Sequence, residues 1–371
     1  MTKPMKLLTV LGTRPEMIRL SKLIQHLDAD SRFQHVYVHT GQNDHPQLRD
    51  VFYQDLNLRL PNYRFDSRKS TRLKTIQEMK IRIAEVIEKE KPQAFLVLGD
   101  TDSALTAEVA KKMNVPIFHM EAGNRCFDRR SPEEANRKLI DRLSDFNLPY
   151  SFYGEANLIK ERIKKPIFIT GSPLREVLSP LLNQIKDNKV LTQHQLKPRQ
   201  YFVWSTHRAE HIDDDRVFQK LIQTLTALSN HYPMMKILVT THPRFQKKLA
   251  IIQPTFPKNV EFHPPFGLID YLSLQLHSYA VLSDSGSIHE EADILGFHAV
   301  HLRRRHERQE AEVIPVTYLS EFKTKNILSY LEKLKGQPKK QRVKAYQEKN
   351  FSMKVAQYIF GRLLEVYPQK D

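Results

Sequence analysis

The sequence has little cysteine and no long apolar run. Its 371 residues include a single cysteine, Cys126, so no disulfide can form within the chain. Nothing in this composition points to an oxidising compartment, where disulfides are common. No apolar segment approaches the roughly 20 residues that a transmembrane helix needs. The short apolar run 7–11 is followed by no signal-peptide cleavage site. We therefore expect a cytoplasmic protein without a membrane span.

Glycine is also scarce, and its placement is informative. The chain has only 11 glycines, well below the usual share of about 7%. Six of them follow apolar runs or the polar residues that end those runs: Gly12, Gly41, Gly99, Gly123, Gly171 and Gly286. This placement indicates tight turns after buried strands, where the backbone approaches a neighbour closely.

Acidic residues are outnumbered by basic ones. The 58 lysines and arginines against 42 acidic residues give a net charge of +16. Such a charge suits nucleic acid, an anionic membrane surface or a phosphorylated substrate. Much of the excess lies in 160–165 and 333–349, away from the strand-ending turns, and no RNA-binding signature is present. We expect a solvated basic surface and do not expect nucleic-acid binding.

Apolar runs of strand length alternate with segments of helical periodicity. Before residue 180, strands are predicted at 7–11, 36–39, 95–98, 115–120 and 168–170, and helices at 15–27, 75–90, 103–113 and 133–143. After residue 200, strands are predicted at 201–204, 236–239, 260–262, 280–282 and 299–302, and helices at 217–229, 288–295 and 352–366. The polar, lysine-rich segment 181–199 is predicted to be a linker.

Alternating strands and helices favour right-handed βαβ units and parallel sheets. A chain of 371 residues is also long for one domain. We therefore predict an α/β protein with two doubly wound, Rossmann-like domains, at residues 1–180 and 181–351, and a cleft between them. The final segment, 352–371, is predicted to be a helix that packs back on the first domain.

Three carboxylates are candidates for proton transfer. Asp100 and Glu121 each end an apolar run near a glycine, and Glu133 follows them. Ligands of parallel α/β sheets bind at such strand ends, and moving a carbon-bound proton needs an acid and a base. A helix cap for Asp100 and a first-turn helix residue for Glu133 are structural alternatives. Glu121 has little structural reason to end an apolar strand.

Two turns that open helices are typical of anion-binding sites. Gly12-Thr-Arg14-Pro-Glu follows the first strand, and Ser285-Gly286-Ser287 follows a later one. Free N–H groups and the helix dipole hold anions at such positions, and an arginine adds a forked donor. An ordinary strand–helix turn and a capped helix are the alternatives. Neither a Walker loop nor a GxGxxG motif follows the first strand, so NAD and ATP are not favoured.

The second half of the chain offers further candidates. His207-Arg208 and His242 end strands, and Phe266 follows a Pro-Pro pair where it can stack on a base. Each has a purely structural alternative as a core or loop residue. We expect no metal site, because the chain has no HExxH motif and no cysteine pair, and the two histidines have no obvious third ligand.

Taken in order, these motifs resemble the non-hydrolysing UDP-N-acetylglucosamine 2-epimerase family, which has the GT-B fold. The matching motifs cover nearly the whole chain: Gly12-Thr-Arg-Pro-Glu, Thr40-Gly-Gln, Gly99-Asp-Thr, Glu121-Ala-Gly, Pro132-Glu-Glu-Ala-Asn-Arg, Thr170-Gly-Ser-Pro, Thr206-His-Arg, Asp284-Ser-Gly and Glu307-Arg. So many motifs in one order make the resemblance specific.

The resemblance implies a reaction without a cofactor. UDP leaves by anti elimination to give a 2-acetamidoglycal, and syn re-addition follows with C2 protonated from the other face. By similarity Asp100, Glu121 and Glu133 are the acid/base groups, and His207 assists at the departing diphosphate. The residues that by similarity contact the UDP-sugar are Arg14, Arg19, Gln42, Arg137, Arg208, His242, Phe266, Ser285, Gly286, Ser287, Glu291 and Arg308. The resemblance also implies a homodimer.

One segment resembles a particular branch of the family. Asn124-Arg-Cys-Phe-Asp128 and Ile18-Arg19 are similar to the UDP-N-acetyl-L-fucosamine synthases of capsule and O-antigen pathways. Those enzymes invert C2 of UDP-2-acetamido-2,6-dideoxy-L-talose. Interconversion of UDP-GlcNAc and UDP-ManNAc is the alternative within the family. A GT-B glycosyltransferase, and a nucleotide-sugar sensor or nucleic-acid binder, are the alternatives of other classes.

The chain departs from the family pattern at five positions. Gln309 and Ala311 replace the proline and glycine of a family loop motif, Arg142 replaces a histidine, Ala209 replaces a glutamate and His211 replaces an asparagine. These changes leave the candidate carboxylates intact, so they bear on the choice of sugar more than on catalysis.

Overall fold

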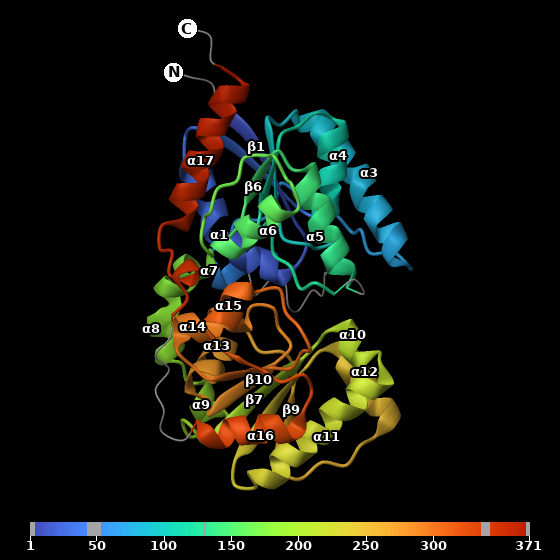
Figure 1. Ribbon diagram of the computed structural model, residues 1–371, viewed down its shortest axis with the longest axis vertical. Helices are drawn as coiled ribbons and strands as arrows, with labels where there is room; N and C mark the ends of the chain where they lie inside the picture. Colours follow the sequence, from blue (N-terminus) through green and yellow to red (C-terminus); the bar gives the residue numbers. More distant parts are fainter. Residues whose placement is uncertain (1–3, 43–52, 129–130, 335–341, 369–371) are drawn as a thin grey trace. The chain divides into compact units, whose positions relative to one another are not determined.

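The computed structural model describes residues 4–42, 53–128, 131–334 and 342–368. The chain forms two compact units (Figure 1). Unit 1 is made of Met1–Ser179 and Lys344–Asp371, and unit 2 of Pro180–Val343. The sequence placed the domain boundaries at 180/181 and 351/352. In the structure the chain returns to unit 1 after Val343, eight residues before the predicted boundary. No helix within these described segments is both long enough and apolar enough to cross a bilayer.

Unit 1 contains a parallel sheet of six strands in the order β3-β2-β1-β4-β5-β6. Its strands are β1 (Met5–Leu11), β2 (Phe33–His39), β3 (Tyr63–Arg64), β4 (Ala94–Leu98), β5 (Ile117–Met120) and β6 (Phe146–Leu148). The strand order reverses between β1 and β4, where Leu8 pairs with Phe95. Ligands of open α/β sheets bind beyond the carboxyl ends of the strands at such a reversal.

Two groups of helices cover the sheet of unit 1 (Figure 1). Its helices are α1 (Arg14–Ala29), α3 (Arg72–Glu90), α4 (Ala107–Lys112), α5 (Pro132–Leu143), α6 (Phe152–Lys160), α7 (Leu174–Leu178) and α17 (Phe351–Val366). Helices α3, α4 and α5 lie side by side, while α1 contacts α7 and α17. In α17, Tyr358 stacks on Phe168 with ring centroids 4.2 Å apart, so the end of the chain packs on this unit.

Unit 2 repeats the same topology with the strand order β12-β11-β10-β7-β8-β9, again all parallel. Its strands are β7 (Tyr201–Thr206), β8 (Lys236–Thr241), β9 (Val260–His263), β10 (Ala280–Ser283), β11 (Ala299–His301) and β12 (Tyr318–Leu319). The reversal lies between β7 and β10, where Trp204 pairs with Leu282. Both side chains are fully buried in the core of the unit. The prediction of two doubly wound α/β units is thereby confirmed.

The helices of unit 2 pack on its sheet around that core. They are α8 (Leu182–Lys186), α9 (Val190–Gln193), α10 (Ala209–Ile212), α11 (Asp215–His231), α12 (Pro243–Ile252), α13 (Leu268–His277), α14 (Ile288–Leu295), α15 (Gln309–Val313) and α16 (Thr324–Lys333). Helix α11 contacts α16, and α13 contacts α8 and α9.

Some local predictions were wrong, and each error has a physical cause. The predicted strand 168–170 is reduced to an isolated bridge between Asn147 and Ile167. The predicted linker 181–199 contains α8 and α9, whose Ile185 and Val190 are buried. Its apolar residues are few, but they fall where the segment meets α13, so packing orders a segment that its composition marks as a loop. The helices α6, α12, α13 and α16 were not predicted.

Candidate functional site

A buried carboxylate closes the turn between β1 and α1. Glu16 accepts hydrogen bonds from the backbone amides of Gly12 (3.0 Å) and Thr13 (2.9 Å), and from the Thr101 hydroxyl (2.8 Å). Burial raises the pKa of Glu16 to about 7. The amides of Gly12 and Thr13 are therefore already engaged by a carboxylate of the chain itself. An anion near this turn would rely on Arg14, which is half-buried.

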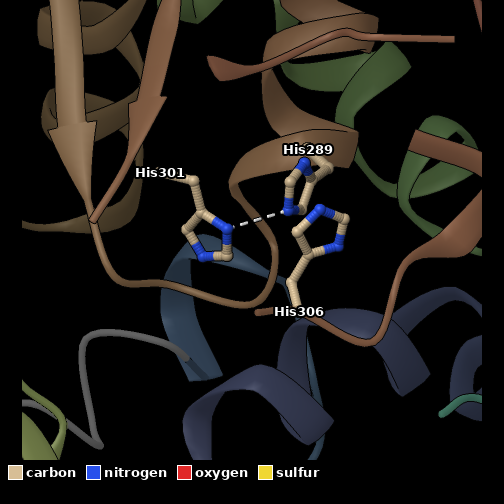
Figure 2. Close-up of side chains that lie close together, drawn as sticks. All are labelled: His289, His301 and His306. Atoms are coloured by element: carbon tan, nitrogen blue, oxygen red, sulfur yellow. Dashed lines mark hydrogen bonds between the residues drawn. The ribbon is translucent and has the colours of Figure 1, made fainter. Parts of the chain in front are cut away.

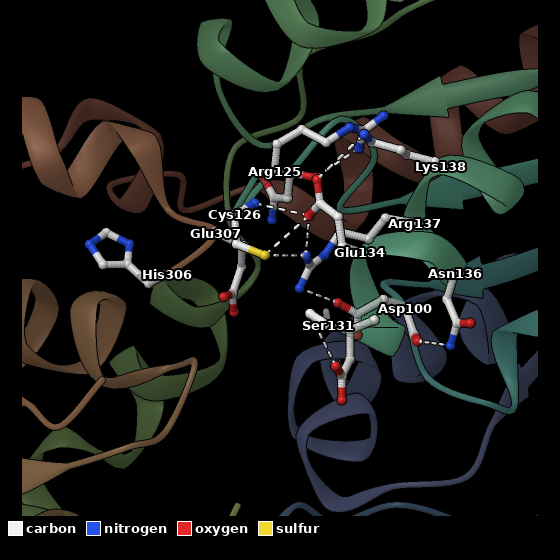
Figure 3. Close-up of polar contacts among 12 residues, drawn as sticks. Asp100, Arg125, Cys126, Ser131, Glu134, Asn136, Arg137, Lys138, His306 and Glu307 are labelled. Atoms are coloured by element: carbon white, nitrogen blue, oxygen red, sulfur yellow. Dashed lines mark hydrogen bonds and ion pairs between the residues drawn. The ribbon is translucent and has the colours of Figure 1, made fainter. Parts of the chain in front are cut away.

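Asp100 follows β4 and is held by α5 (Figure 3). Gly99 turns the chain with a φ of +69°, in the left-handed region that glycine tolerates. Oδ2 of Asp100 lies 2.6 Å from Nη2 of Arg137, and the Asn136 amide donates to the Asp100 carbonyl at 2.8 Å. The Asp100 side chain remains 22% exposed. The arginine favours an ionised carboxylate that solvent, and hence a substrate, can still reach.

Glu121 follows β5 in a strained backbone conformation. Its φ of +65° lies in the left-handed region, which costs a non-glycine residue about 1–3 kcal/mol. Oε1 accepts a hydrogen bond from the Asn124 amide at 3.2 Å, and Oε2 lies 3.8 Å from Nη1 of Arg19. The residue is only 9% exposed. Strain at a buried, doubly oriented carboxylate is typical of a functional position.

Glu133 and Glu134 open α5 but have different surroundings. Glu133 is half-buried and accepts a hydrogen bond from the Ser131 hydroxyl at 2.7 Å. Glu134 is buried, and its Oε2 accepts from the Cys126 amide and from Nη1 of Arg137, both at 2.9 Å (Figure 3). The adjacent glutamate, which sequence reasoning passed over, therefore positions the arginine that pairs with Asp100. Only its place in the Glu-Glu pair hinted at this.

A buried ionic network around Asp141 lies next to the segment that follows Glu121. Oδ1 of Asp141 is 2.9 Å from Nδ1 of His119, and Oδ2 is 2.7 Å from Nη2 of Arg125. The same carboxylate accepts from the Gly123 amide at 3.2 Å, and Arg125 also pairs with Glu161 at 2.8 Å. Burial acts to raise the pKa of Asp141, but His119 and Arg125 hold it below its ordinary value. This network fixes the chain just after Glu121.

Two further predicted contact residues of unit 1 have structural partners. The side-chain oxygen of Gln42 accepts from the Ser103 amide at 2.9 Å and from the Ser103 hydroxyl at 2.8 Å. Arg19 is buried in α1 and lies beside Glu121. Unit 1 therefore brings Arg19 and Arg137 to Glu121 and Asp100, the two carboxylates that the sequence placed at the ends of the adjacent strands β4 and β5.

In unit 2 a buried aspartate, Asp284, anchors the His207 turn. Its carboxylate accepts from the backbone amides of His207 (3.1 Å) and Arg208 (3.0 Å). It also lies 3.0 Å from Nδ1 of both His207 and His211. Burial acts to raise the pKa of Asp284, but the two histidines hold it well below its ordinary value. The His207 side chain stays 43% exposed, so it is oriented yet accessible. Asp284 was noted only as part of a motif.

Consecutive hydrogen bonds link the side chains of the turn after β10 to helix α14. The Ser285 and Ser287 hydroxyls lie 2.9 Å apart, and Ser287 donates to Oε1 of Glu291 at 2.6 Å. The other oxygen of Glu291 accepts from Gln275 at 2.9 Å. A Cβ at Gly286 would come within 2.9 Å of Oε1 of Glu307, so a larger residue here would require the Glu307 side chain to shift. The predicted nucleotide-binding turn is thus compact and half-exposed.

The other predicted contact residues of unit 2 are more scattered. Arg308 is buried, and its Nη2 lies 3.2 Å from Oε2 of the equally buried Glu290. The Phe266 ring packs edge-on against His194, with ring centroids 5.4 Å apart. His242 caps α12 by accepting from the Arg244 amide, and Nη1 of Arg208 pairs with Glu210 at 2.9 Å.

The departures from the family pattern have mild local effects. Gln309 is the first residue of α15, a position where proline is common but not required. Ala311 is buried in the same short helix. Arg142 is exposed on α5, whereas its neighbour Asp141 is fully buried. None of the contacts described above for Asp100, Glu121 and Glu133 involves these three residues.

Comparison with known proteins decides the family. A family model described as UDP-N-acetylglucosamine 2-epimerase matches residues 25–360. The chain belongs to this family. It is 32% identical over 334 residues to the UDP-N-acetylglucosamine 2-epimerase of Methanococcus maripaludis, covering 88% of this chain and 90% of the relative. It is 31% identical over 305 residues to the UDP-2,3-diacetamido-2,3-dideoxy-D-glucuronate 2-epimerase of Pseudomonas aeruginosa, covering 81% and 83%.

Solved structures of family members also match the fold of this chain. The structure of the Rickettsia bellii UDP-N-acetylglucosamine 2-epimerase matches with a TM-score of 0.88 and 35% identity over 98% of both chains. The Methanocaldococcus jannaschii enzyme, solved in complex with UDP-GlcNAc and UDP, matches with a TM-score of 0.89 and 28% identity over 96% of this chain and 99% of that one. These matches confirm the predicted GT-B fold class. The family member described here is an isomerase, a UDP-sugar 2-epimerase.

Proposed function

We propose that this epimerase inverts C2 of a UDP-N-acetylhexosamine by eliminating and re-adding UDP. The observation that supports this most is the pair of oriented carboxylates in unit 1. Asp100 pairs with Arg137, Glu121 is held by Arg19 and Asn124, and both carboxylates end adjacent strands. A reaction that takes a proton from one face of a carbon and returns one to the other needs two such groups.

The proposed reaction needs no oxidant. A carboxylate removes the C2 proton while the bond between C1 and the UDP oxygen breaks, which leaves a glycal with a C1–C2 double bond. The UDP oxygen then forms the bond to C1 again, while C2 takes a proton on the opposite face. We assign the proton transfers at C2 to Asp100 and Glu121, with Glu133 as the third acid/base group.

We assign the departing nucleotide to residues of unit 2. Departure of UDP leaves negative charge on the diphosphate, which polar donors must stabilise. His207, oriented by Asp284 and still exposed, is suited to that task. The proposed UDP-sugar contacts are those that the resemblance implies: Arg14, Arg19, Gln42, Arg137, Arg208, His242, Phe266, Ser285, Gly286, Ser287, Glu291 and Arg308.

For the sugar, we propose UDP-2-acetamido-2,6-dideoxy-L-talose, with UDP-N-acetyl-L-fucosamine as product, in capsule or O-antigen synthesis. The support for this sugar comes from one contact near Glu121. Asn124, the first residue of the segment that resembles this branch, donates to the carboxylate of Glu121. A residue in contact with the acid/base group can affect which sugar is processed. We also propose the homodimer of the family resemblance, which sedimentation of the purified chain would test.

Deuterium exchange tests the reaction and the substrate together. The enzyme is incubated in deuterated water with UDP-GlcNAc, the L-talose derivative or the diacetamido-glucuronate derivative, and C2 is followed by NMR. We expect deuterium at C2 and a second epimer with the L-talose derivative. Efficient epimerisation of UDP-GlcNAc without activity on the L-talose derivative would contradict the substrate.

The same experiment separates the other class of enzyme. A glycosyltransferase needs an acceptor and leaves the C2 hydrogen in place, so neither deuterium nor epimer with any of the three sugars would contradict the epimerase proposal. Asn124→Leu is the matched variant, because it removes the hydrogen bond to Glu121 and, by the family resemblance, introduces the leucine that is usual in the UDP-GlcNAc branch. We expect it to lower activity on the L-talose derivative more than on UDP-GlcNAc.

A further inference from the structure

Three buried histidines of unit 2 converge in one place (Figure 2). His289 lies in α14, His301 ends β11, and His306 lies in the loop that follows. Each ring offers one nitrogen to a group whose nitrogens all lie within 4.8 Å of one another. All three residues are at most 4% exposed. Side chains that can ligate a metal are therefore held together by a helix, a strand and a loop.

Hydrogen bonds already link two of the rings to each other and one of them to Thr317. Nε2 of His289 lies 3.1 Å from Nδ1 of His301, and the Thr317 hydroxyl lies 2.7 Å from Nδ1 of His289. Two nitrogens bound to one tetrahedral zinc at about 2.0–2.1 Å are roughly 3.3 Å apart, close to the separation found here. If Nδ1 of His289 donates to Thr317, its Nε2 keeps a free lone pair. A metal-bound histidine normally has such an outer partner.

Nε2 of His301 is buried and has no hydrogen-bond partner among the residues that the structure describes. If His301 coordinates a metal through Nδ1, the ring proton moves to Nε2, where a small adjustment or a water can receive it. His306 accepts from the Arg308 amide through Nδ1 at 3.2 Å. Coordination through its Nε2 moves that ring's proton to Nδ1, so the amide must then turn away.

Charged side chains of both signs surround the cluster. The charged groups that act on the rings or pair next to them include Arg303, Arg308, Glu307, Glu290, Asp284 and Glu312, whose Oε1 lies 3.8 Å from Nε2 of His306. Carboxylates outnumber arginines in this set.

We propose that His289, His301 and His306 bind one divalent transition-metal ion, with Zn²⁺ as the expected ion and Thr317 as the outer partner of His289. The ion would join α14 to the loop 302–308, which carries Glu307 and Arg308. No short metal motif marks the site, because its ligands come from three elements, and the sequence therefore predicted none. The proposal does not rest on the epimerase reaction.

Metal titration of the full chain tests the proposal. The protein is purified without a histidine tag, stripped with a chelator and titrated with Zn²⁺, and with Co²⁺ as a visible-absorbing probe. We expect one equivalent to bind, with the strong visible absorption of tetrahedral Co²⁺. His301→Val and His306→Ala should weaken binding by at least tenfold, and Thr317→Val by about 10–100-fold. His231→Gln, at an exposed histidine of the same unit, should change nothing.

Two results would overturn the proposal. One is a wild-type chain that binds no stoichiometric Zn²⁺. The other is binding that persists in folded His301→Val and His306→Ala, judged by circular dichroism. If either variant fails to fold, X-ray absorption of the Zn²⁺-loaded wild type decides instead. Three imidazole nitrogens around the ion support the site, and fewer than three refute it.

Discussion

Replacing Asp141 by asparagine tests the buried network under Glu121. The change keeps the size of the side chain and an oxygen that can accept from the Gly123 amide, but it removes a charge from a fully buried site. Removing one partner of a buried ion pair costs about 3–5 kcal/mol. Arg125 keeps its second partner, Glu161, at 2.8 Å. We therefore expect the lower end, a loss of about 3 kcal/mol in the free energy of unfolding.

Urea unfolding followed by far-ultraviolet circular dichroism measures this loss. The matched control is Asp145→Asn, since Asp145 forms part-exposed pairs with Lys111 and Lys165 and should cost at most about 1 kcal/mol. The pKa of Asp141 is lowered in the folded state, so its contribution is present above the ordinary value of 3.8 and is lost as the pH falls below it. Equal losses for the two variants at pH 7 would refute the reasoning.

Three other predictions concern the same unit. Glu121→Gln preserves shape but removes the proton-transfer group, so deuterium incorporation should fall by about 10²–10⁴-fold with UDP binding retained; near-normal turnover would exclude the assigned role. Gly123→Ala places a Cβ 2.1 Å from the Gly154 carbonyl oxygen at a φ of +75°, and should lower the melting temperature more than Gly296→Ala, where the added Cβ meets nothing within 4 Å. Burial raises the pKa of Cys126, so iodoacetamide at pH 8 should label the native chain far more slowly than the chain in urea, and equal rates would disprove that burial.

The sequence allowed the strand ends to be predicted because their signal is local. An apolar run followed by an acidic residue and a glycine marks β4 and β5, and the structure places Asp100 and Glu121 at those ends. The parallel topology then follows from the alternation of strands and helices. The features that could be predicted are local ones: the periodicity of apolar residues, the residues of the turns, and the order of strands and helices along the chain.

The partners of those carboxylates were not predictable in the same way. Arg137 reaches Asp100 from a helix that starts more than thirty residues later. Asp284 meets the His207 turn only because β7 and β10 are neighbours in the sheet. Such contacts depend on packing between distant segments, and no periodicity or motif spacing encodes them. The histidine cluster was missed for the same reason.

The segment 124–128 shows why a sequence signature and a substrate preference are different kinds of information. Asn124 contacts Glu121, but Arg125 points its guanidinium into the pairs with Asp141 and Glu161. The backbone of Cys126 is held by Glu134. Two of these residues therefore serve the fold, and a relative could keep them for stability while acting on another sugar. Of the contacts seen here, only that of Asn124 bears on the sugar, so the substrate proposal depends on this side chain. This is why Asn124→Leu tests the preference more sharply than exchange of the whole segment, which would also disturb the network around Asp141.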